Sequence, residues 1–435
     1  MNTHKHQTPD RLPFELFLLA LFLASRVVYL WLTLGHEAGY DTGAHMEMVQ
    51  HLTWLNPSTP LNQYFYSYHP PLGFLFAHTL TWFGLSPLLA IQLLNFAASI
   101  AAFFLVRATL QATGLLDQAA PVFFLYLWSS LPIQLFLTSS INLDILIQAL
   151  ACATLYFSVR LFWGGEAERQ NRAWLAFGIV AAISTALLTK FSGLLLITIP
   201  PLVAFSLQKN VVRLTGMAVT VSLVGLAVAA PYYITRYYEP AGRLFPTNLE
   251  IFSPPEIERA RAQRDAAGME FFAALVQPSP FRGSAEIIRD RDTMRLADAW
   301  QDVWLKEKNL GPMNARAQAL GTLEKGLAGF LLIGGLFWLL WHFRASEPWH
   351  RLGAVWLAFA ALQLSAFVFY LYSQPVAGWA PTKGIYLACS LPIVAYGIAR
   401  LVPEAGQGRW RELIQTSVLT LVALLIVLHH LLPMQ

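Results

Sequence analysis

The residues best suited to chemistry lie in one polar segment that follows the first long apolar run. Asp41 comes first, His45 and Glu47 follow within two helical turns, and Tyr68-His69 close the segment before a pair of prolines. A carboxylate with histidines nearby can accept a proton as a general base. Ionisable residues beside a bilayer are costly unless they pair or have a function. We therefore predict that the reaction site lies here, on the outer face of a membrane.

Asp41 and His69 each have a structural alternative. Asp41 precedes a predicted amphipathic helix over 42–55, which it can cap while remaining able to accept a proton. His45 lies one turn beyond Asp41, whereas Glu47 falls on a different face. His69 is predicted at the start of the next helical run, beside the positive end of its dipole. On chemistry alone, an ordinary interfacial histidine is the favoured interpretation of His69.

Three further charged residues lie near the predicted ends of apolar runs. Asp144, in Asn142-Leu143-Asp144, suits the first turn of a helix and is expected to orient other groups rather than to react. Lys190 and Lys383 both lie on the predicted outer side, where basic residues are uncommon. Each can bind a lipid phosphate or extend to the headgroups, and the sequence favours neither role.

The composition indicates a membrane protein. Of the 435 residues, 56% are hydrophobic and 12% are charged, against about 25% charged in soluble proteins. The apolar run at 71–84 is too short to span and is expected to be interfacial or re-entrant. We predict an all-helical polytopic bundle with 11 membrane-spanning helices, at 14–34, 87–110, 119–138, 141–162, 173–189, 192–208, 214–235, 326–343, 353–372, 384–400 and 412–432.

Basic residues gather in every second connection between the predicted spans. This pattern places the N-terminus in the cytoplasm and the loop 35–86 outside. Three parts follow: an N-terminal membrane module over 1–235, which includes that loop, a large outer loop over 236–325, and the C-terminal spans over 326–435. Helical spacing over 256–275 predicts a small helical cap within the large loop.

Several classes of function are disfavoured by what the sequence lacks. The net charge is +4 and the basic residues form no stripe with aromatics, so nucleic-acid binding is not expected. Phosphate-loop, dinucleotide-binding, zinc-protease and hydrolase motifs are absent. Cys152 and Cys389 lie in separate apolar runs and are expected to be buried hydrophobic residues. No cofactor is therefore expected, and an activated group is expected to arrive on a lipid.

Five short motifs follow one another along the chain: Gly39-Tyr40-Asp41, His69-Pro70-Pro71-Leu72, Asn142-Leu143-Asp144, the turn Leu187–Phe191, and Lys383 followed by Tyr386-Leu387 and Pro392. Their order resembles that of the GT-C membrane glycosyltransferases, in the branch of protein O-mannosyltransferases and lipid A aminoarabinose transferases, over most of residues 14–400. Many members of that branch have a second acidic residue directly after the first, whereas Thr42 follows Asp41 here, which weakens the case for a metal site.

This resemblance implies an inverting glycosyltransferase. Its donor would be a sugar on a polyprenyl phosphate, and its acceptor would be a hydroxyl of a protein, lipid or envelope glycan. Separately, the short loops favour a bacterial inner membrane. Asp41 would be the general base, with His45 and Glu47 as further catalytic candidates. No metal is favoured, although Asp41 and His45 would be the first ligands if one bound. The substrate-binding candidates are Tyr68, His69, Asp144, Lys190, Arg243, Arg282, Lys383 and Tyr386.

Two other functions stay open on the sequence. One is a transporter or lipid flippase without covalent chemistry, and the other is a non-catalytic partner in envelope assembly that docks through the large loop. Transporters often have two similar halves and broken spans near the membrane midplane. The sequence shows neither feature, and its polar candidates gather at one face. This asymmetry favours an enzyme.

Overall fold

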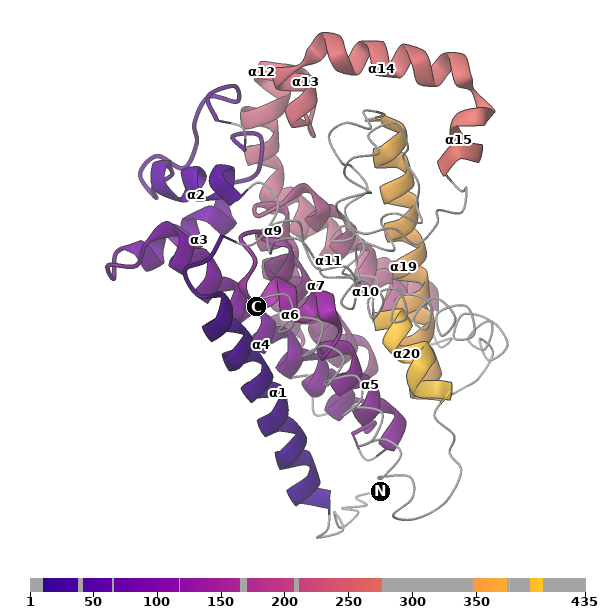
Figure 1. Cartoon of the computed structure of the whole chain (residues 1–435). Coiled ribbons are helices and arrows are strands. Elements are labelled where there is room, and N and C mark those ends of the chain that lie inside the picture. Colours follow the sequence, from indigo (N-terminus) through magenta and orange to yellow (C-terminus); the bar gives the residue numbers. More distant parts are fainter. Residues whose placement is uncertain are drawn as a thin grey trace.

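The computed structural model describes residues 11–37, 42–64, 66–116, 118–164, 170–206, 211–275, 347–373, 375 and 392–401. Every regular element in these residues is a helix. Long helices run side by side in a bundle, and several shorter helices lie at one of its ends (Figure 1). The predicted all-helical fold is confirmed for this part of the chain.

Five of the described helices are long and apolar enough to cross a membrane. Each overlaps a predicted span, and the protein is an integral membrane protein. The five helices are α1 (Arg11–Thr33), α4 (Pro87–Ala112), α7 (Asp144–Trp163), α11 (Val211–Tyr233) and α19 (Pro348–Ser373).

Two other predicted spans depart from a single straight α-helix. The first is a pair, α5 (Ala119–Ser129) and α6 (Pro132–Ser139), bent by 50°. The bend lies where Pro132 begins a new helix, because proline cannot donate the backbone hydrogen bond that would continue the previous one. The second is a 3-10 segment, η1 (Phe191–Thr198), which continues into α10 (Ile199–Phe205).

The remaining predicted spans are short or incompletely described. α9 (Arg172–Leu187) is a shorter apolar helix, and α20 (Pro392–Leu401) covers the second half of the span predicted at 384–400. The spans predicted at 326–343 and 412–432 lie outside the described residues. The total of 11 spans therefore stays a prediction.

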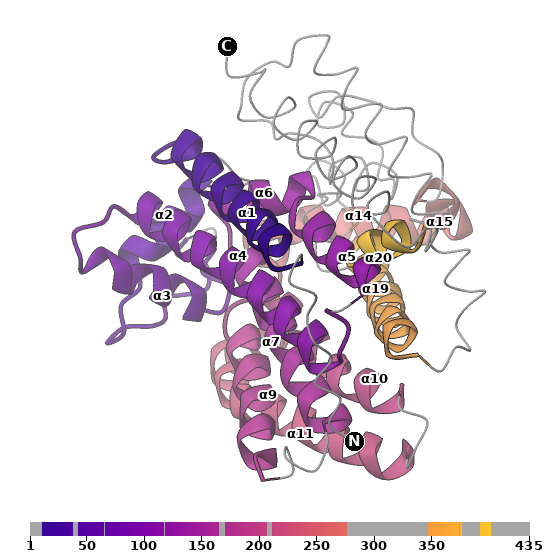
Figure 2. The same ribbon diagram turned by 90° about the horizontal axis from the view of Figure 1, so that it is seen from below.

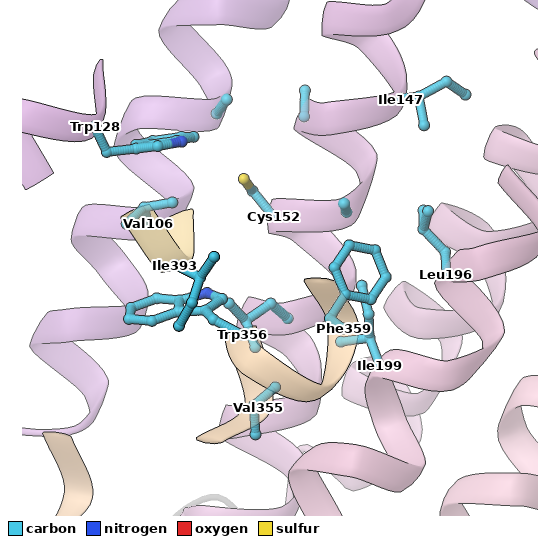
Figure 3. Packing of buried hydrophobic residues seen from close by; sticks show 14 of the residues in the cluster. Val106, Trp128, Ile147, Cys152, Leu196, Ile199, Val355, Trp356, Phe359 and Ile393 are labelled. Atoms are coloured by element: carbon cyan, nitrogen blue, oxygen red, sulfur yellow. The ribbon is translucent and has the colours of Figure 1, made fainter. Parts of the chain in front are cut away.

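Helix α7 lies at the centre of the bundle. It packs against α4, α9 and α10, and α9 packs in turn against α11 (Figure 2). Side chains of α4, α5, α7, α10, α19 and α20 meet in one apolar cluster around Cys152, which is buried as predicted (Figure 3). Cys389 lies outside the described residues. Because α7 is packed on several sides, the position of its first residue, Asp144, is fixed by the bundle.

The shorter helices form two groups at one end of the bundle (Figure 1). The first loop contains α2 (Thr42–His51) and α3 (Leu72–Thr81). The large loop begins with α12 (Glu239–Ala241), α13 (Asn248–Phe252), α14 (Pro254–Ala267) and α15 (Met269–Leu275). α14 lies across this end of the bundle, as expected for a helical cap. The division of the chain into three parts stays a prediction.

Two predicted helices are shorter than expected. The helix predicted over 42–55 ends at His51, because Thr53 and Asn56 exchange backbone hydrogen bonds in a turn and the residue before Pro57 disfavours helical geometry. The helix predicted over 256–275 breaks at Gly268, whose φ of 55° is left-handed and suits glycine.

The cap contacts α19 through arginines. Arg261 Nε donates to the carbonyl of Ser373 at 3.0 Å, and Arg264 donates to the carbonyl of Tyr372. The Arg264 guanidinium also lies 4.0 Å from the centre of the Tyr372 ring. Cations at a helix C-terminus satisfy its last carbonyls and interact favourably with its dipole. The apolar face expected for α14 is reduced to one buried residue, Ile257.

Substitutions at two glycines test the close packing of η1 against α9. A Cβ atom on Gly193 would overlap the backbone of Ala186, whereas a Cβ on Gly216 in α11 would meet open space. We expect Gly193→Ala to lower the free energy of unfolding by about 1–3 kcal/mol through overpacking. The matched Gly216→Ala should be neutral or stabilising by about 0.5–1 kcal/mol. Thermal unfolding in detergent measures both, and equal melting temperatures would contradict the close packing.

Candidate functional site

An ion pair lies at the centre of the candidate site. Lys190 Nζ is 2.7 Å from Asp144 Oδ1, and both side chains are largely buried. Asp144 is the first residue of α7, and Lys190 lies in the turn between α9 and η1. The two residues are 46 positions apart, so only the packing of α7 against α9 brings them together.

Backbone contacts around the ion pair fix the surrounding turns. Asn142 Oδ1 accepts a hydrogen bond from the backbone N–H of Asp144 at 2.7 Å, which satisfies one free donor at the start of α7. On the other side, the N–H of Leu72 donates to the carbonyl of Leu188 at 2.8 Å. The start of α3 is therefore attached directly to the turn that contains Lys190.

Amide side chains of α4 hold the neighbouring helix ends. Asn95 Nδ2 donates to the carbonyls of Ser140 and Asn142, both at 2.6 Å. Gln92 Nε2 donates to the carbonyl of Thr33 at the end of α1, at 2.9 Å. Both amides lie within an apolar span and are buried, and buried polar groups normally have partners. Here their partners are backbone carbonyls at the ends of the helices that surround the site.

Aromatic and histidine rings connect the first loop to the ion pair. The ring centre of Tyr66 lies 4.4 Å from that of His45 and 4.7 Å from that of His69. The His69 ring lies 4.2 Å from Tyr68 and 6.1 Å from Phe191, the residue after Lys190. Stacked and edge contacts of this kind hold rings in defined orientations. Thus His45, Tyr68 and His69, three predicted site residues, belong to one cluster beside Lys190.

The environment of His69 favours a neutral ring. Burial lowers its pKa well below the usual value, and the nearby positive charges of Lys190 and of protonated His45 lower it further. Its Nδ1 atom is buried without a hydrogen-bond partner, and so is Oδ2 of Asp144. Unsatisfied polar atoms are rare in folded proteins and call for an explanation. A polar ligand at this cluster would supply the missing partners.

Arg236 is a residue of the site region that the sequence analysis missed. It lies in a short π-helix, η2 (Ile234–Tyr238), at the end of α11. Its guanidinium donates to the carbonyls of Thr59 and Ser67, the latter at 3.1 Å. Single π-turns inside helices often occur at functional sites. The signal in the sequence was a lone arginine directly after the apolar span 214–235.

Other predicted site residues lie elsewhere. Glu47 lines a separate surface groove with Gln50 and His51, while His45 on the same helix is buried. Arg243 is exposed on the cap and pairs with Glu250. Four candidates lie outside the described residues: Asp41, Arg282, Lys383 and Tyr386.

Glu250 has a structural role in the cap. Burial by itself would raise its pKa, but hydrogen bonds from Arg261 and from the backbone of Thr247, with the charge of Arg243, outweigh this effect, and the pKa of Glu250 is lowered. Glu250 is therefore charged near neutral pH. Its ion pair with Arg261 links α13 to α14, and Arg261 in turn contacts α19.

The expected absence of a metal stays a prediction. Among the residues that the structure describes, no three His, Cys, Asp or Glu side chains are placed to hold a metal ion. Asp41 is not among those residues, so the expected absence of a metal is untested.

The ion pair can be tested by charge removal. Lys190→Met leaves Asp144 charged without its partner, which we expect to cost about 3–5 kcal/mol of unfolding free energy. The double variant Asp144→Asn/Lys190→Met removes both charges and should cost clearly less. As a control, Arg243→Met at an exposed pair should cost at most about 1 kcal/mol. Unfolding in mixed micelles measures these free energies. Equal losses of unfolding free energy in Lys190→Met and in the double variant would refute a coupled pair.

The neutral state of His69 predicts a pH dependence of stability. Because the pKa is lower in the folded state, the unfolded chain binds the proton first as the pH falls below about 6.5. Folding stability should therefore decrease from pH 7 to pH 5, by up to about 1.4 kcal/mol per pH unit from this residue. His69→Gln should show a smaller decrease over the same range. An identical pH profile for wild type and variant would contradict the assignment.

Comparisons with known proteins give structural matches only. No family model matches the sequence, and no curated protein does. The oligosaccharyltransferase of Archaeoglobus fulgidus, crystallised tethered to an acceptor peptide with the NVT sequon, matches with a TM-score of 0.55 and 11% identity. The match covers 96% of this chain and 55% of that protein. This chain thus spans about half the length of that oligosaccharyltransferase.

Two crystal structures of ArnT from Cupriavidus metallidurans also match, one in the apo state and one with undecaprenyl phosphate bound. Their TM-scores are 0.41 and 0.42, at 17% and 16% identity, over 88% of this chain and 78% of ArnT. At 11% identity, the likeness to the oligosaccharyltransferase shows the fold alone. On the likeness to the oligosaccharyltransferase, the chain has the GT-C fold of membrane glycosyltransferases.

Proposed function

We propose that the protein is a membrane glycosyltransferase that moves a sugar from a polyprenyl phosphate to an acceptor hydroxyl. The observation that carries this proposal is the Asp144–Lys190 ion pair, held beside His69 at one end of a GT-C bundle. A lysine at this end of the bundle can bind a lipid phosphate through the point charge of its ammonium group. The oligosaccharyltransferase match supports the class of fold on which this chemistry takes place.

In the proposed reaction the acceptor oxygen attacks the anomeric carbon of the donor sugar. The bond between that carbon and the phosphate oxygen breaks, and the polyprenyl phosphate leaves with the electron pair. Asp41 takes the acceptor proton as a general base, and attack from the opposite side inverts the anomeric configuration. Asp41 directly precedes α2, which begins at Thr42. A positioned base of this kind contributes about 10²–10⁴-fold in rate.

Lys190 is the proposed partner of the leaving phosphate. Fixed positive charge is most effective where negative charge develops in the transition state, and the contact with Asp144 holds the Lys190 ammonium in one place. Neutral His69 contributes a hydrogen bond rather than a charge. Lys383 and Arg282 stay candidates for further phosphate contacts, whereas Arg243 is already paired with Glu250.

The proposed orientation follows the basic residues in the sequence. The N-terminus is cytoplasmic, the membrane is the bacterial inner membrane, and the ion pair, α2, α3 and the cap face the periplasm. The acceptor is a protein, lipid or envelope glycan that meets the cap of the large loop. The matched oligosaccharyltransferase was crystallised with a peptide acceptor, so peptides belong among the acceptors to be tested.

A donor panel tests the proposal. Purified protein in lipid is supplied with labelled polyprenyl-phosphate sugars and membrane extract as the acceptor source, and release of the sugar from the lipid is followed. We expect turnover of one donor by wild type, and a loss of about 10²–10⁴-fold in Asp41→Asn with donor binding retained. Glu47→Gln, in a separate groove, is the matched control and should keep its activity.

Other outcomes would change the assignment. Equal turnover in wild type and Asp41→Asn would remove Asp41 from the mechanism and direct attention to Asp144. No turnover of any donor would overturn the glycosyltransferase proposal and favour a transporter or flippase.

A further inference from the structure

The first loop belongs to a long stretch of chain without formal charge. Between Glu47 and Arg107 the sequence has no Asp, Glu, Lys or Arg. Part of this stretch is the start of the span α4, but residues 52–86 precede it and include α3 and its flanking turns. A water-exposed loop of this length normally contains charges, since about a quarter of the residues in soluble proteins are charged. The composition of this loop is that of a segment in contact with lipid.

Four large apolar side chains of this loop are exposed. The exposed fraction is 99% for Leu55, 79% for Phe83, 64% for Trp82 and 44% for Trp54. Leu55 and Trp54 follow the end of α2, and Trp82 and Phe83 follow the end of α3. Scattered exposed apolar residues are normal, but a contiguous group marks an interaction surface.

Trp54, of the first pair, contacts α3, the helix that the second pair follows. Trp54 Nε1 donates to Thr79 Oγ1 of α3 at 2.9 Å, and the Trp54 ring lies 6.2 Å from that of Phe76. Phe76 and Thr79 are three residues apart and so lie on one face of α3. Trp54 therefore packs on the helix that leads into Trp82 and Phe83. We call Trp54, Leu55, Trp82 and Phe83 the apolar edge.

Both indole N–H groups of the apolar edge have partners within the protein. Trp54 donates to Thr79, and Trp82 Nε1 donates to Nε2 of His78 at 3.3 Å. An indole whose N–H is satisfied internally loses little when its ring leaves water. The edge can thus enter an apolar medium without leaving these donors unpaired.

We propose that the apolar edge inserts into the boundary between headgroups and acyl chains of the bilayer that the bundle crosses. α2 and α3 project sideways from the bundle beside the end of α1 and the start of α4 (Figure 1). Trp31, near the end of α1, is also highly exposed, at 78%. Tryptophan and other aromatic residues concentrate at this level of a membrane. A charge-free edge also offers nothing for ionic pairing with a protein partner.

Insertion of the edge has a consequence for the candidate site. Tyr66, Tyr68 and His69 lie in the chain between the two halves of the edge, and Arg236 ties the same loop to α11. The loop is therefore held at two places, by lipid on its outer side and by the bundle on its inner side. This sets its depth relative to the lipid phosphates. The insertion itself does not depend on the proposed reaction.

Spin labels test the insertion without any assay of activity. Single cysteines replace Leu55 and Phe83 in a Cys152→Ala/Cys389→Ala background, and the labelled proteins are placed in phosphatidylcholine vesicles. Phe17→Cys, on the exposed face of α1, is the membrane control, and Gln63→Cys, exposed in the same loop, is the water control. Collision rates with oxygen, which partitions into lipid, and with a water-soluble nickel chelate are compared.

We expect the ratio of oxygen to nickel collisions at positions 55 and 83 to match that at position 17 and to exceed that at position 63 several-fold. Ratios at 55 and 83 equal to that at 63 would place the edge in water and overturn the proposal. Low access to both reagents would indicate cover by protein and would overturn it as well.

A second measurement avoids labels and cysteine changes. Brominated phosphatidylcholine quenches the fluorescence of tryptophans that contact acyl chains. The quenched fraction should be smaller in Trp54→Phe/Trp82→Phe than in wild type, because two lipid-facing indoles are lost. An unchanged quenched fraction would contradict insertion, whatever the enzymatic activity of the protein.

Discussion

The arrangement of the site depends on the free-energy cost of burying a charged side chain at the end of a membrane bundle. Asp144 and Lys190 are both largely buried at 2.7 Å, and either one alone would be an uncompensated charge in a poorly solvated position. Keeping them together requires α7 to begin, and α9 to end, at the same level. Asn142 holds the start of α7, and the carbonyl of Leu188 attaches the first loop by accepting from the N–H of Leu72.

A second constraint is the supply of hydrogen-bond partners where helices stop. Carbonyls at helix ends within a membrane have little water to bind. Here Gln92 and Asn95, one turn apart on α4, bind the carbonyls at the end of α1 and at the break between α6 and α7. The broken and short spans are therefore compatible with the bilayer, and they make room for polar side chains at one end of the bundle.

The parts outside the bundle are attached by arginines to backbone carbonyls. Arg236 binds two carbonyls of the first loop, and Arg261 and Arg264 bind the last carbonyls of α19. Such contacts depend on few side chains, so loop and cap can differ between proteins of one fold while the bundle stays the same.

The sequence by itself determined the membrane class, most of the described spans and the polar end of the bundle, because hydropathy and charge alternation are local properties. It also indicated Asp144, Lys190 and His69 as candidates. Only the tertiary structure decided that Asp144 and Lys190 form a pair, that His45 is buried against Tyr66, and that Arg236 holds the first loop. These are contacts between residues far apart in the chain, or faces chosen by packing, and no local pattern encodes them.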